Sequence, residues 1–299
     1  MKNTVRIAPN EGRNLRAARL RSLLEQKEPV VAPCCNDALS AKLIEQAGFD
    51  MTFMSGFAAS ASRIGMPDLG LMSYGEVVDH VRNISEATSL PFVADGDTGY
   101  GNAMNVIRTV KGLARAGAAA VMIEDQVAPK RCGHTLGKAV VEREVAFDRI
   151  KAAVDAREEE DVLILARTDA RKAHGLGEAI ERAQRFFELG ADIIFIKAPQ
   201  SVEEMLQICE ETPGLLMANM LEGGDTPILS HAELADMGFN LAAYPLTLLS
   251  AVMQQMVETL AAMKADTVQT SGLMSFEEVR ERVGFNAYYA ASEGYKAWG

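Results

Sequence analysis

Residues 118–125 read Ala-Ala-Ala-Val-Met-Ile-Glu-Asp, an uninterrupted apolar run followed directly by two carboxylates. A strand with both faces buried in a parallel sheet has this continuous apolar pattern, whereas a half-buried strand alternates apolar with polar residues. Similar short runs recur between segments with helical patterns. Counting the first, there are eight, at 29–32, 51–54, 92–94, 119–123, 162–166, 193–196, 215–218 and 241–244. They predict eight buried parallel strands.

The segments between these runs carry the start and stop signals of helices. Four show the Ser-x-x-Glu pattern of a capping box, in which a hydroxyl and a carboxylate satisfy amides of the first turn. These are Ser73/Glu76, Ser201/Glu204, Ser230/Glu233 and Ser275/Glu278. Glycines that can end a helix in a left-handed conformation stand before four strands, at Gly48, Gly117, Gly190 and Gly238.

Eight strand–helix units predict an α/β fold, a closed (β/α)8 TIM barrel in which reactive groups follow the strands. An open doubly wound sheet is the alternative. We expect one domain over residues 1–299, with an additional helix at about 12–26 before the first strand and a helical tail at about 246–299 after the last. In a barrel the residues that follow the strands meet at one rim, so the site is expected there.

Composition and charge argue against several classes of function. The 299 residues contain 30 Lys and Arg against 41 Asp and Glu, a net charge of −11, which disfavours nucleic acids and membrane surfaces as partners. The apolar runs are far shorter than the ~20 residues of a membrane span. The start of the chain lacks the apolar centre of a secretory signal, and the four cysteines lack CxxC spacing. We therefore expect a cytoplasmic protein.

Carboxylates follow the second, third and fourth predicted strands. Asp95 and Asp97 follow the third within Asp-Gly-Asp-Thr-Gly-Tyr-Gly, Glu124 follows the fourth, and the loop after the second brings Asp68. Carboxylates gathered at one rim repel one another unless a hard divalent cation lies among them. We expect Mg²⁺, with Mn²⁺ possible. Asp95 and Asp97 could instead be capping or turn residues, but Glu124 on the next strand favours the metal.

The loop after the fourth strand contains a candidate acid or base. Residues 126–144 are long for such a loop, as active-site lids often are, and they include Lys130, Arg131, Cys132 and His134. Two cations and a histidine near a thiol stabilise its thiolate and suit it to proton transfer near neutral pH. The alternative is a loop cysteine without a function.

Further strand ends carry groups that can bind carboxylates. Arg167 ends the fifth strand, where its guanidinium can hold a substrate carboxylate with two hydrogen bonds; an ion pair with Glu124 is the equal alternative. Asn219 ends the seventh strand, and Ser55 and Gly56 after the second offer a hydroxyl and free amides. These three could instead serve simple turn chemistry.

Eight short motifs are spread over most of the chain. They are Asn-Asp-Ala-Leu-Ser-Ala at 36–41, Ser-Gly at 55–56, Gly-Met-Pro-Asp-Leu-Gly at 65–70, Asp-Gly-Asp-Thr-Gly-Tyr-Gly-Asn at 95–102, Glu-Asp-Gln at 124–126, Lys-Arg-Cys-Gly-His at 130–134, Ala-Arg-Thr-Asp-Ala at 166–170 and Ala-Asn-Met at 218–220. Together they resemble the isocitrate lyase/phosphoenolpyruvate mutase superfamily. The segment at 130–134 is similar to the lyase branch, with its methylisocitrate and alkylmalate lyases. Carboxyvinyl-carboxyphosphonate phosphonomutases share that segment.

The resemblance implies an assembly and roles for individual residues. It implies a homotetramer, a dimer of dimers, that uses the tail in subunit contacts and exchanges the last barrel helix, 246–264 here, between partners. Asp95 would be the principal Mg²⁺ ligand, with Asp68, Asp97 and Glu124 binding through water. The residues that bind a small carboxylate substrate would be Phe53, Ser55, Gly56, Phe57, Gly133, Arg167 and Asn219. The catalytic residues would be Cys132, His134 and Lys130.

Two positions depart from the pattern of the lyases. Phe53 stands where they usually carry tyrosine, which removes a hydroxyl, and Lys197 follows the sixth strand where many members carry glutamate, which reverses a charge. The expected activity is that of a Mg²⁺-dependent carbon–carbon lyase. It would cleave a 2-hydroxy di- or tricarboxylate, of the 2-alkylmalate or methylisocitrate type, into a 2-oxo acid and a carboxylic acid. The alternatives are a phosphonomutase, an oxaloacetate decarboxylase or hydrolase, and a catalytically silent barrel that binds a dicarboxylate.

Overall fold

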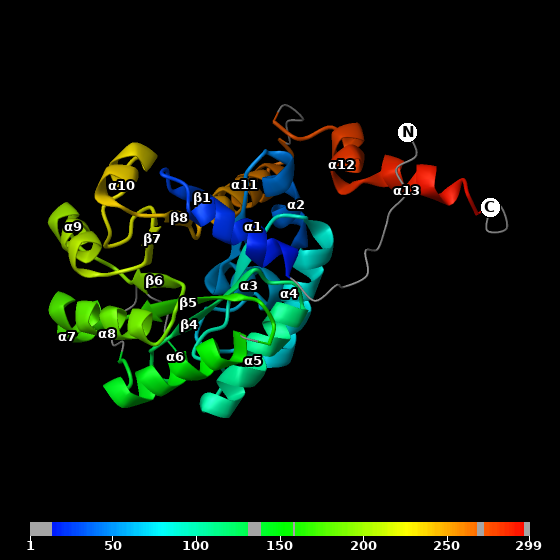
Figure 1. Ribbon diagram of the computed structural model, residues 1–299. Helices are drawn as coiled ribbons and strands as arrows, with labels where there is room; N and C mark the ends of the chain where they lie inside the picture. Colours follow the sequence, from blue (N-terminus) through cyan, green and yellow to red (C-terminus); the bar gives the residue numbers. More distant parts are fainter. Residues whose placement is uncertain (1–13, 131–138, 158, 268–271, 296–299) are drawn as a thin grey trace. The chain divides into compact units, whose positions relative to one another are not determined.

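The computed structural model describes residues 14–130, 139–157, 159–267 and 272–295 (Figure 1). The chain falls into two compact units, Met1–Leu248 and Leu249–Gly299. The first unit contains the strands and the candidate site. The second contains most of the helix that follows the last strand, together with two shorter helices.

The strands of the first unit form a closed parallel barrel in chain order. They are β1 Val30–Cys35, β2 Thr52–Met54, β3 Phe92–Asp95, β4 Ala120–Glu124, β5 Leu163–Thr168, β6 Ile193–Ile196, β7 Leu215–Asn219 and β8 Leu241–Tyr244. The predicted (β/α)8 barrel is confirmed. The open sheet is wrong, because β8 pairs with β1 over four residues of each strand and closes the ring.

Helices surround the strands (Figure 1). In the first unit they are α1 Leu15–Leu24, α2 Ala38–Gln46, α3 Gly56–Ile64, α4 Tyr74–Ala87, α5 Ala103–Arg115, α6 Arg143–Arg157, α7 Ala170–His174, α8 Leu176–Glu188, α9 Val202–Glu211 and α10 His231–Met237. α11 Thr247–Lys264 runs from the first unit into the second, which also holds α12 Phe276–Val283 and α13 Phe285–Ser292. Among the described residues, no helix is both long and apolar enough to cross a membrane.

Most of the predicted helix start and stop signals act as expected. Capping boxes with both hydrogen bonds form at Ser73, Ser230 and Ser275. At Ser201 only the hydroxyl half forms, because the Glu204 carboxylate accepts hydrogen bonds from the Arg171 side chain and the Gln200 amide instead. The four glycines expected before strands all have positive φ, between 87° and 107°.

Alternate strand residues face two different layers of the core. Val93 and Met122 belong to the cluster inside the barrel, which α1 completes, whereas Ala94 and Ile123 pack with the outer helices. Because side chains alternate along a strand, the residue two positions after an inward-facing one also faces inward. The strand ends therefore deliver a set of polar side chains into the barrel mouth: Asp95, Glu124, Arg167, Lys197 and Asn219.

Candidate active site

A cavity opens at the carboxyl ends of the strands. It contains about 560 Å³ of empty space, including the part open to solvent. The predicted site residues that line it are Phe53, Ser55, Phe57, Asp68, Asp95, Arg167 and Asn219. The structure thus brings residues from separate loops and strands, distant in sequence, to one place.

Two carboxylates that line the cavity, Asp68 and Asp95, belong with Asp97 to a group of three around the ammonium of Lys130. The Nζ atom is 2.9 Å from Asp68 Oδ1 and 3.9 Å from Asp95 Oδ2, and it also pairs with Asp97. The Lys130 side chain is only 4% exposed. Burial alone would lower the pKa of Lys130, but the surrounding carboxylates raise it well above its usual value. This acidic cluster, Asp68, Asp95 and Asp97, therefore surrounds a permanent positive charge.

The donor set of the acidic cluster fits a divalent metal ion. In the described part of the chain, no three His, Cys, Asp or Glu side chains have the spacing of a metal site; the carboxylates surround Lys130 instead. Their oxygens are nevertheless the hard donors that Mg²⁺ and Mn²⁺ prefer, and the ammonium shows that a cation is accepted between them. Burial raises the pKa of Asp97 to about 6, against the opposing effect of Lys130.

The backbone at the start of α3 orients Asp95. The carboxylate accepts hydrogen bonds from the amides of Asp97 at 3.0 Å and Gly56 at 3.3 Å. A Cβ atom on Gly56 would lie 2.5 Å from Asp95 Oδ2, so a side chain here would collide with the carboxylate. Ser55 lines the cavity and also caps α3, since its hydroxyl accepts a hydrogen bond from the Ala58 amide at 3.3 Å.

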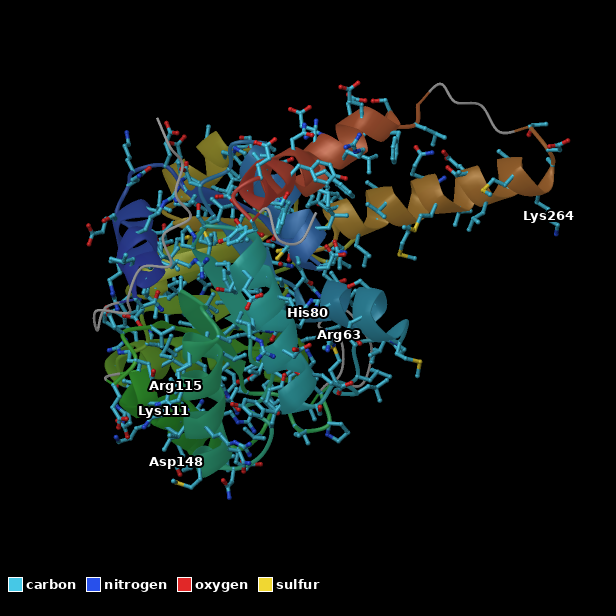
Figure 2. All side chains as sticks on the ribbon, turned by 90° about the vertical axis from the view of Figure 1, so that its right-hand side faces the viewer. Arg63, His80, Lys111, Arg115, Asp148 and Lys264 are labelled. Carbon is cyan, nitrogen blue, oxygen red and sulfur yellow. The ribbon has the colours of Figure 1, made fainter. Side chains whose placement is uncertain are left out.

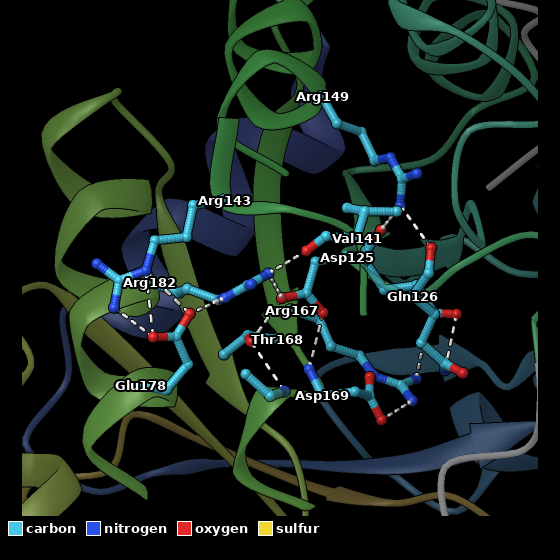
Figure 3. A network of polar contacts seen from close by, with 12 residues as sticks. Asp125, Gln126, Val141, Arg143, Arg149, Arg167, Thr168, Asp169, Glu178 and Arg182 are labelled. Carbon is cyan, nitrogen blue, oxygen red and sulfur yellow. Dashed lines mark hydrogen bonds and ion pairs between the residues drawn. The ribbon is translucent and has the colours of Figure 1, made fainter. Parts of the chain in front are cut away.

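Arg167 is paired with two buried carboxylates (Figure 3). Its Nη1 atom is 2.9 Å from Glu124 Oε2, and its Nε and Nη2 atoms donate to Asp169 at 2.7 and 3.1 Å. Arg167 therefore forms the ion pair weighed above and still lines the cavity. Glu124 belongs to this pair and not to the acidic cluster around Lys130. Burial raises the pKa of Glu124 to about 8, although the charge of Arg167 acts to lower it.

Behind Arg167 lies a polar network that the sequence patterns do not reveal (Figure 3). Asp125 accepts hydrogen bonds from the Thr168 hydroxyl at 2.7 Å, the Asp169 amide at 2.9 Å and Arg182 at 3.1 Å. These bonds tie the ends of β4 and β5 to α8 and so fix the orientation of Arg167. The sequence does give a hint of Asp125 and Asp169, because each lies within two residues of a candidate site residue.

The side of the cavity formed by β5, β6 and β7 is rich in hydrogen-bond donors. Asn219 is 8% exposed, and its Nδ2 atom has no hydrogen-bond partner among the described residues. Lys197 lines the same cavity, with its Nζ atom 5.6 Å from the centroid of the Phe195 ring. The Arg167 Cζ atom is 5.7 Å from that centroid. Cations and a free amide donor thus stand across the cavity from the acidic cluster.

Three residues of the predicted catalytic segment, Cys132, Gly133 and His134, lie outside the described residues. Lys130 is the last described residue before them, and its ammonium lies within the acidic cluster.

Comparison with known proteins identifies the family. The phosphoenolpyruvate phosphomutase family model matches residues 20–264. The 2,3-dimethylmalate lyase of Eubacterium barkeri is 44% identical over 93% of this chain and 98% of that protein. A structure of oxaloacetate acetylhydrolase in complex with the inhibitor 3,3-difluorooxalacetate has a TM-score of 0.90 and 32% identity, covering 95% of this chain and 98% of the other. Phosphonopyruvate hydrolase in complex with oxalate and Mg²⁺ has a TM-score of 0.84 and 31% identity, covering 94% and 99%. The chain therefore belongs to the phosphoenolpyruvate phosphomutase family.

Proposed function

We propose that this protein is a Mg²⁺-dependent lyase that cleaves a carbon–carbon bond of a 2-hydroxy dicarboxylate of the 2-alkylmalate type. The products are a 2-oxo acid and a carboxylic acid. One observation carries the proposal: a single cavity is lined both by Asp68 and Asp95 of the acidic cluster and by Arg167, Lys197 and Asn219. A 2-hydroxy dicarboxylate has matching ends, a hydroxyl and carboxylate for a metal ion and a second carboxylate for cationic groups. The similarity to 2,3-dimethylmalate lyase supports this choice.

Asp95, with Asp68 and Asp97, would hold the Mg²⁺ ion, and Mn²⁺ would fit the same oxygens. When bound, the ion supplies Lewis-acid chemistry, which lowers the pKa of the substrate hydroxyl and stabilises the 2-oxo product. Glu124 is held by Arg167, so we assign it no direct bond to the ion. The Mg²⁺ bound in phosphonopyruvate hydrolase, 31% identical to this chain, supports the choice of metal.

The remaining steps are proton transfer and charge stabilisation by side chains. The substrate hydroxyl gives its proton to solvent water, the bond between C2 and C3 breaks, and its electron pair moves onto C3 and the adjoining carboxylate. Arg167 and Asn219 face that carboxylate and stabilise its growing negative charge. The Cys132 thiol then donates a proton to C3, and His134 helps to hold the substrate. One proton leaves the substrate and one is returned, so the reaction is balanced.

The rest of the cavity wall is apolar and favours alkyl substituents. Phe53, Phe57, Leu221 and Leu246 line it. Phenylalanine at position 53 offers no hydroxyl to a further carboxylate, and an unpaired carboxylate against these side chains would be poorly solvated. A 2-alkylmalate therefore suits the wall better than a tricarboxylate of the methylisocitrate type.

We also propose a cytoplasmic location. Cys34, Cys35 and Cys209 are free thiols, which suits a reducing compartment.

A substrate panel tests the proposed activity. Purified protein with Mg²⁺ is incubated with 2-alkylmalates, 2-methylisocitrate, oxaloacetate and phosphonopyruvate, and 2-oxo acids are detected by coupled reduction. We expect the highest kcat/KM with a 2-alkylmalate. Turnover confined to oxaloacetate or phosphonopyruvate, or binding without turnover across the panel, would contradict the proposal.

Replacement of the proposed proton donor gives a second test. The Cys132→Ser variant should bind Mg²⁺ like the wild type, because the thiol is not among the proposed ligands, but its kcat should fall by about 100-fold or more. Calorimetric titration with Mg²⁺ and steady-state kinetics measure the two effects. An unchanged kcat would remove Cys132 from the mechanism.

A further inference from the structure

The acidic cluster borders a second cavity besides the one described above. This smaller cavity contains about 290 Å³ of empty space, including the part open to solvent. Asp68 and Asp95 line both cavities, and Asp97 and Tyr100 line the smaller one. Among the described residues that line the smaller cavity, none is a proposed anchor for the substrate carboxylate. Tyr100, which no step above uses, is therefore placed to act on the acidic cluster and not on the substrate.

The Tyr100 side chain is held in place by its surroundings. Its φ is 59°, a conformation that a bulky residue rarely adopts. The turn is fixed to α5, because the Thr109 hydroxyl donates to the Gly99 carbonyl at 3.1 Å. The Tyr100 ring packs beside that of Tyr74, with 6.0 Å between the centroids. Strained backbone of this kind is most common at functional sites, which points to a use for this side chain.

The Tyr100 hydroxyl is a hydrogen-bond donor close to the carboxylates. Its Oη atom is buried and has no hydrogen-bond partner among the described residues. Burial, followed by the charges of Asp97 and Asp95, raises the pKa of Tyr100 well above its usual value, so the hydroxyl keeps its proton. Of the two carboxylates, Asp97 has the larger effect. It is therefore the acceptor that the hydroxyl is best placed to serve.

We propose that Tyr100 is a positioning residue for the divalent ion, whose hydroxyl donates a hydrogen bond to the Asp97 carboxylate in the metal-bound protein. Carboxylates that hold a metal ion are themselves oriented by hydrogen bonds, and loss of such a partner typically weakens metal binding by about 10- to 100-fold. The proposal rests on the proposed function only in placing the ion at the acidic cluster.

The Tyr100→Phe variant removes the hydroxyl and keeps the ring. Calorimetric titration with Mg²⁺ and the EPR signal of free Mn²⁺ measure its affinity for either ion without any assay of turnover. We expect both affinities to fall by about 10-fold. The thermal midpoint of the metal-free variant should equal or exceed that of the wild type, because the variant no longer buries an unpartnered hydroxyl. A merely structural role would lower the midpoint.

Tyr74→Phe is the matched control. The Tyr74 hydroxyl donates to the Arg108 carbonyl at 3.3 Å, and Tyr74 is not among the described residues that line either cavity. This variant removes the same group from the neighbouring ring. Its affinity for Mg²⁺ should stay within about 2-fold of the wild type.

A double-mutant cycle tests whether Tyr100 acts through Asp97. In the Asp97→Asn background, Tyr100→Phe should change the affinity for Mg²⁺ by less than about 3-fold, because a neutral amide holds the ion weakly in any orientation. Asp148→Asn removes an exposed carboxylate from α6 on the outside of the barrel (Figure 2). In that background the full effect of Tyr100→Phe should remain.

The outcomes are distinct. A loss of affinity in Tyr100→Phe that is absent from Tyr74→Phe and disappears in the Asp97→Asn background supports the proposal, even if no 2-alkylmalate is cleaved. Unchanged affinity in Tyr100→Phe would overturn it and leave the proposed function standing. So would an equal loss with and without the Asp97 carboxylate, or a loss accompanied by a lower thermal midpoint. A wild type that binds neither ion at millimolar concentration would overturn the proposed function as well.

Discussion

Within the acidic cluster, Asp95 is the carboxylate that the backbone orients, because the amides of Gly56 and Asp97 donate hydrogen bonds to it. Asparagine has the same shape but no charge, so Asp95→Asn should lower Mg²⁺ affinity by about 100-fold, or about 2.8 kcal/mol. Calorimetry or the EPR signal of free Mn²⁺ measures this loss without any assay of turnover.

The matched control for Asp95→Asn is Asp79→Asn. Asp79 lies on α4, where it pairs with Arg63 and Arg82, and its side chain is 41% exposed. This variant should bind Mg²⁺ like the wild type. Equal affinities in the two variants would show that Asp95 is not the principal ligand.

Glu124 should make the stability of the metal-free protein depend on pH. Burial raises its pKa to about 8 in the folded protein, whereas an unfolded chain releases this proton near pH 4.3. Between these values the folded state holds a proton that the unfolded state lacks, so the stabilisation present below about pH 4 is lost as pH rises towards 8. The difference of one proton corresponds to about 1.4 kcal/mol per pH unit at most.

Glu124→Gln tests the predicted direction of this dependence of stability on pH. The amide cannot ionise, so the free energy of unfolding of the variant should lack this contribution, and it should fall less between pH 5 and 8 than that of the wild type. Urea denaturation in the presence of EDTA measures both curves. If the variant is instead less stable by the same amount at every pH in that range, Glu124 is ionised and acts as a simple ion-pair partner of Arg167.

The start of α3 couples a helix to the acidic cluster. Replacing glycine by alanine in a helix usually stabilises it, by up to about 1 kcal/mol. At Gly56, however, the added methyl would meet Asp95 Oδ2 at 2.5 Å. Gly56→Ala should therefore weaken Mg²⁺ binding by about 10-fold or more, as measured by calorimetry.

Gly75 in the first turn of α4 provides the control, because a Cβ atom there meets no atom within 4 Å. Gly75→Ala should leave Mg²⁺ affinity unchanged and slightly raise the thermal midpoint of unfolding. Normal Mg²⁺ affinity in Gly56→Ala would mean that Asp95 can move without cost.

The strands could be predicted from sequence because each is a continuous apolar run, and 193–196 and 241–244 match β6 and β8 residue for residue. The other strands differ mainly at their ends. β3, β4 and β7 each extend one residue further, through Asp95, Glu124 and Asn219. A prediction based on apolar residues ends each strand before these polar residues, although their backbones still pair with the neighbouring strand. Asp95, Glu124 and Asn219 are thus part of the rigid barrel, whereas Asp68, Asp97 and Lys130 belong to loops.

Among the partners of the site residues, the sequence offers only the Arg167–Glu124 ion pair, and only as one of two alternatives for Arg167. The sequence suggests that Glu124 lies with Asp95 and Asp97, because all three follow neighbouring strands. The register of β4 against β5 instead sets Glu124 opposite Arg167, and the two side chains pair. The place of Lys130 among the carboxylates depends on how the chain after β4 runs, which local sequence patterns do not encode.

In the molecule as a whole, the side chains that stabilise the fold and those of the candidate site lie in different layers of the barrel. The inner cluster and α1 fill the interior with apolar side chains, and the outer cluster fixes the helices. Polar groups are concentrated at the carboxyl ends of the strands. Substitutions at the mouth can therefore change substrate choice while most of the buried apolar area stays intact.

In the described part of the chain, α11 exposes a row of apolar side chains, and we propose that a second copy of this chain covers it. Met253, Met256, Val257 and Leu260 are each 54–63% exposed, and their spacing places them on one helix face. An exposed apolar face of this kind marks a protein interface, which fits the expected homotetramer. Met256→Glu/Leu260→Glu should reduce the mass measured by light scattering to that of a dimer or monomer. Gln254→Glu/Gln255→Glu, which adds the same charge off this face, should keep the tetramer. A monomeric wild type, or a tetramer that survives the first double substitution, would contradict the assignment of this face to subunit contacts.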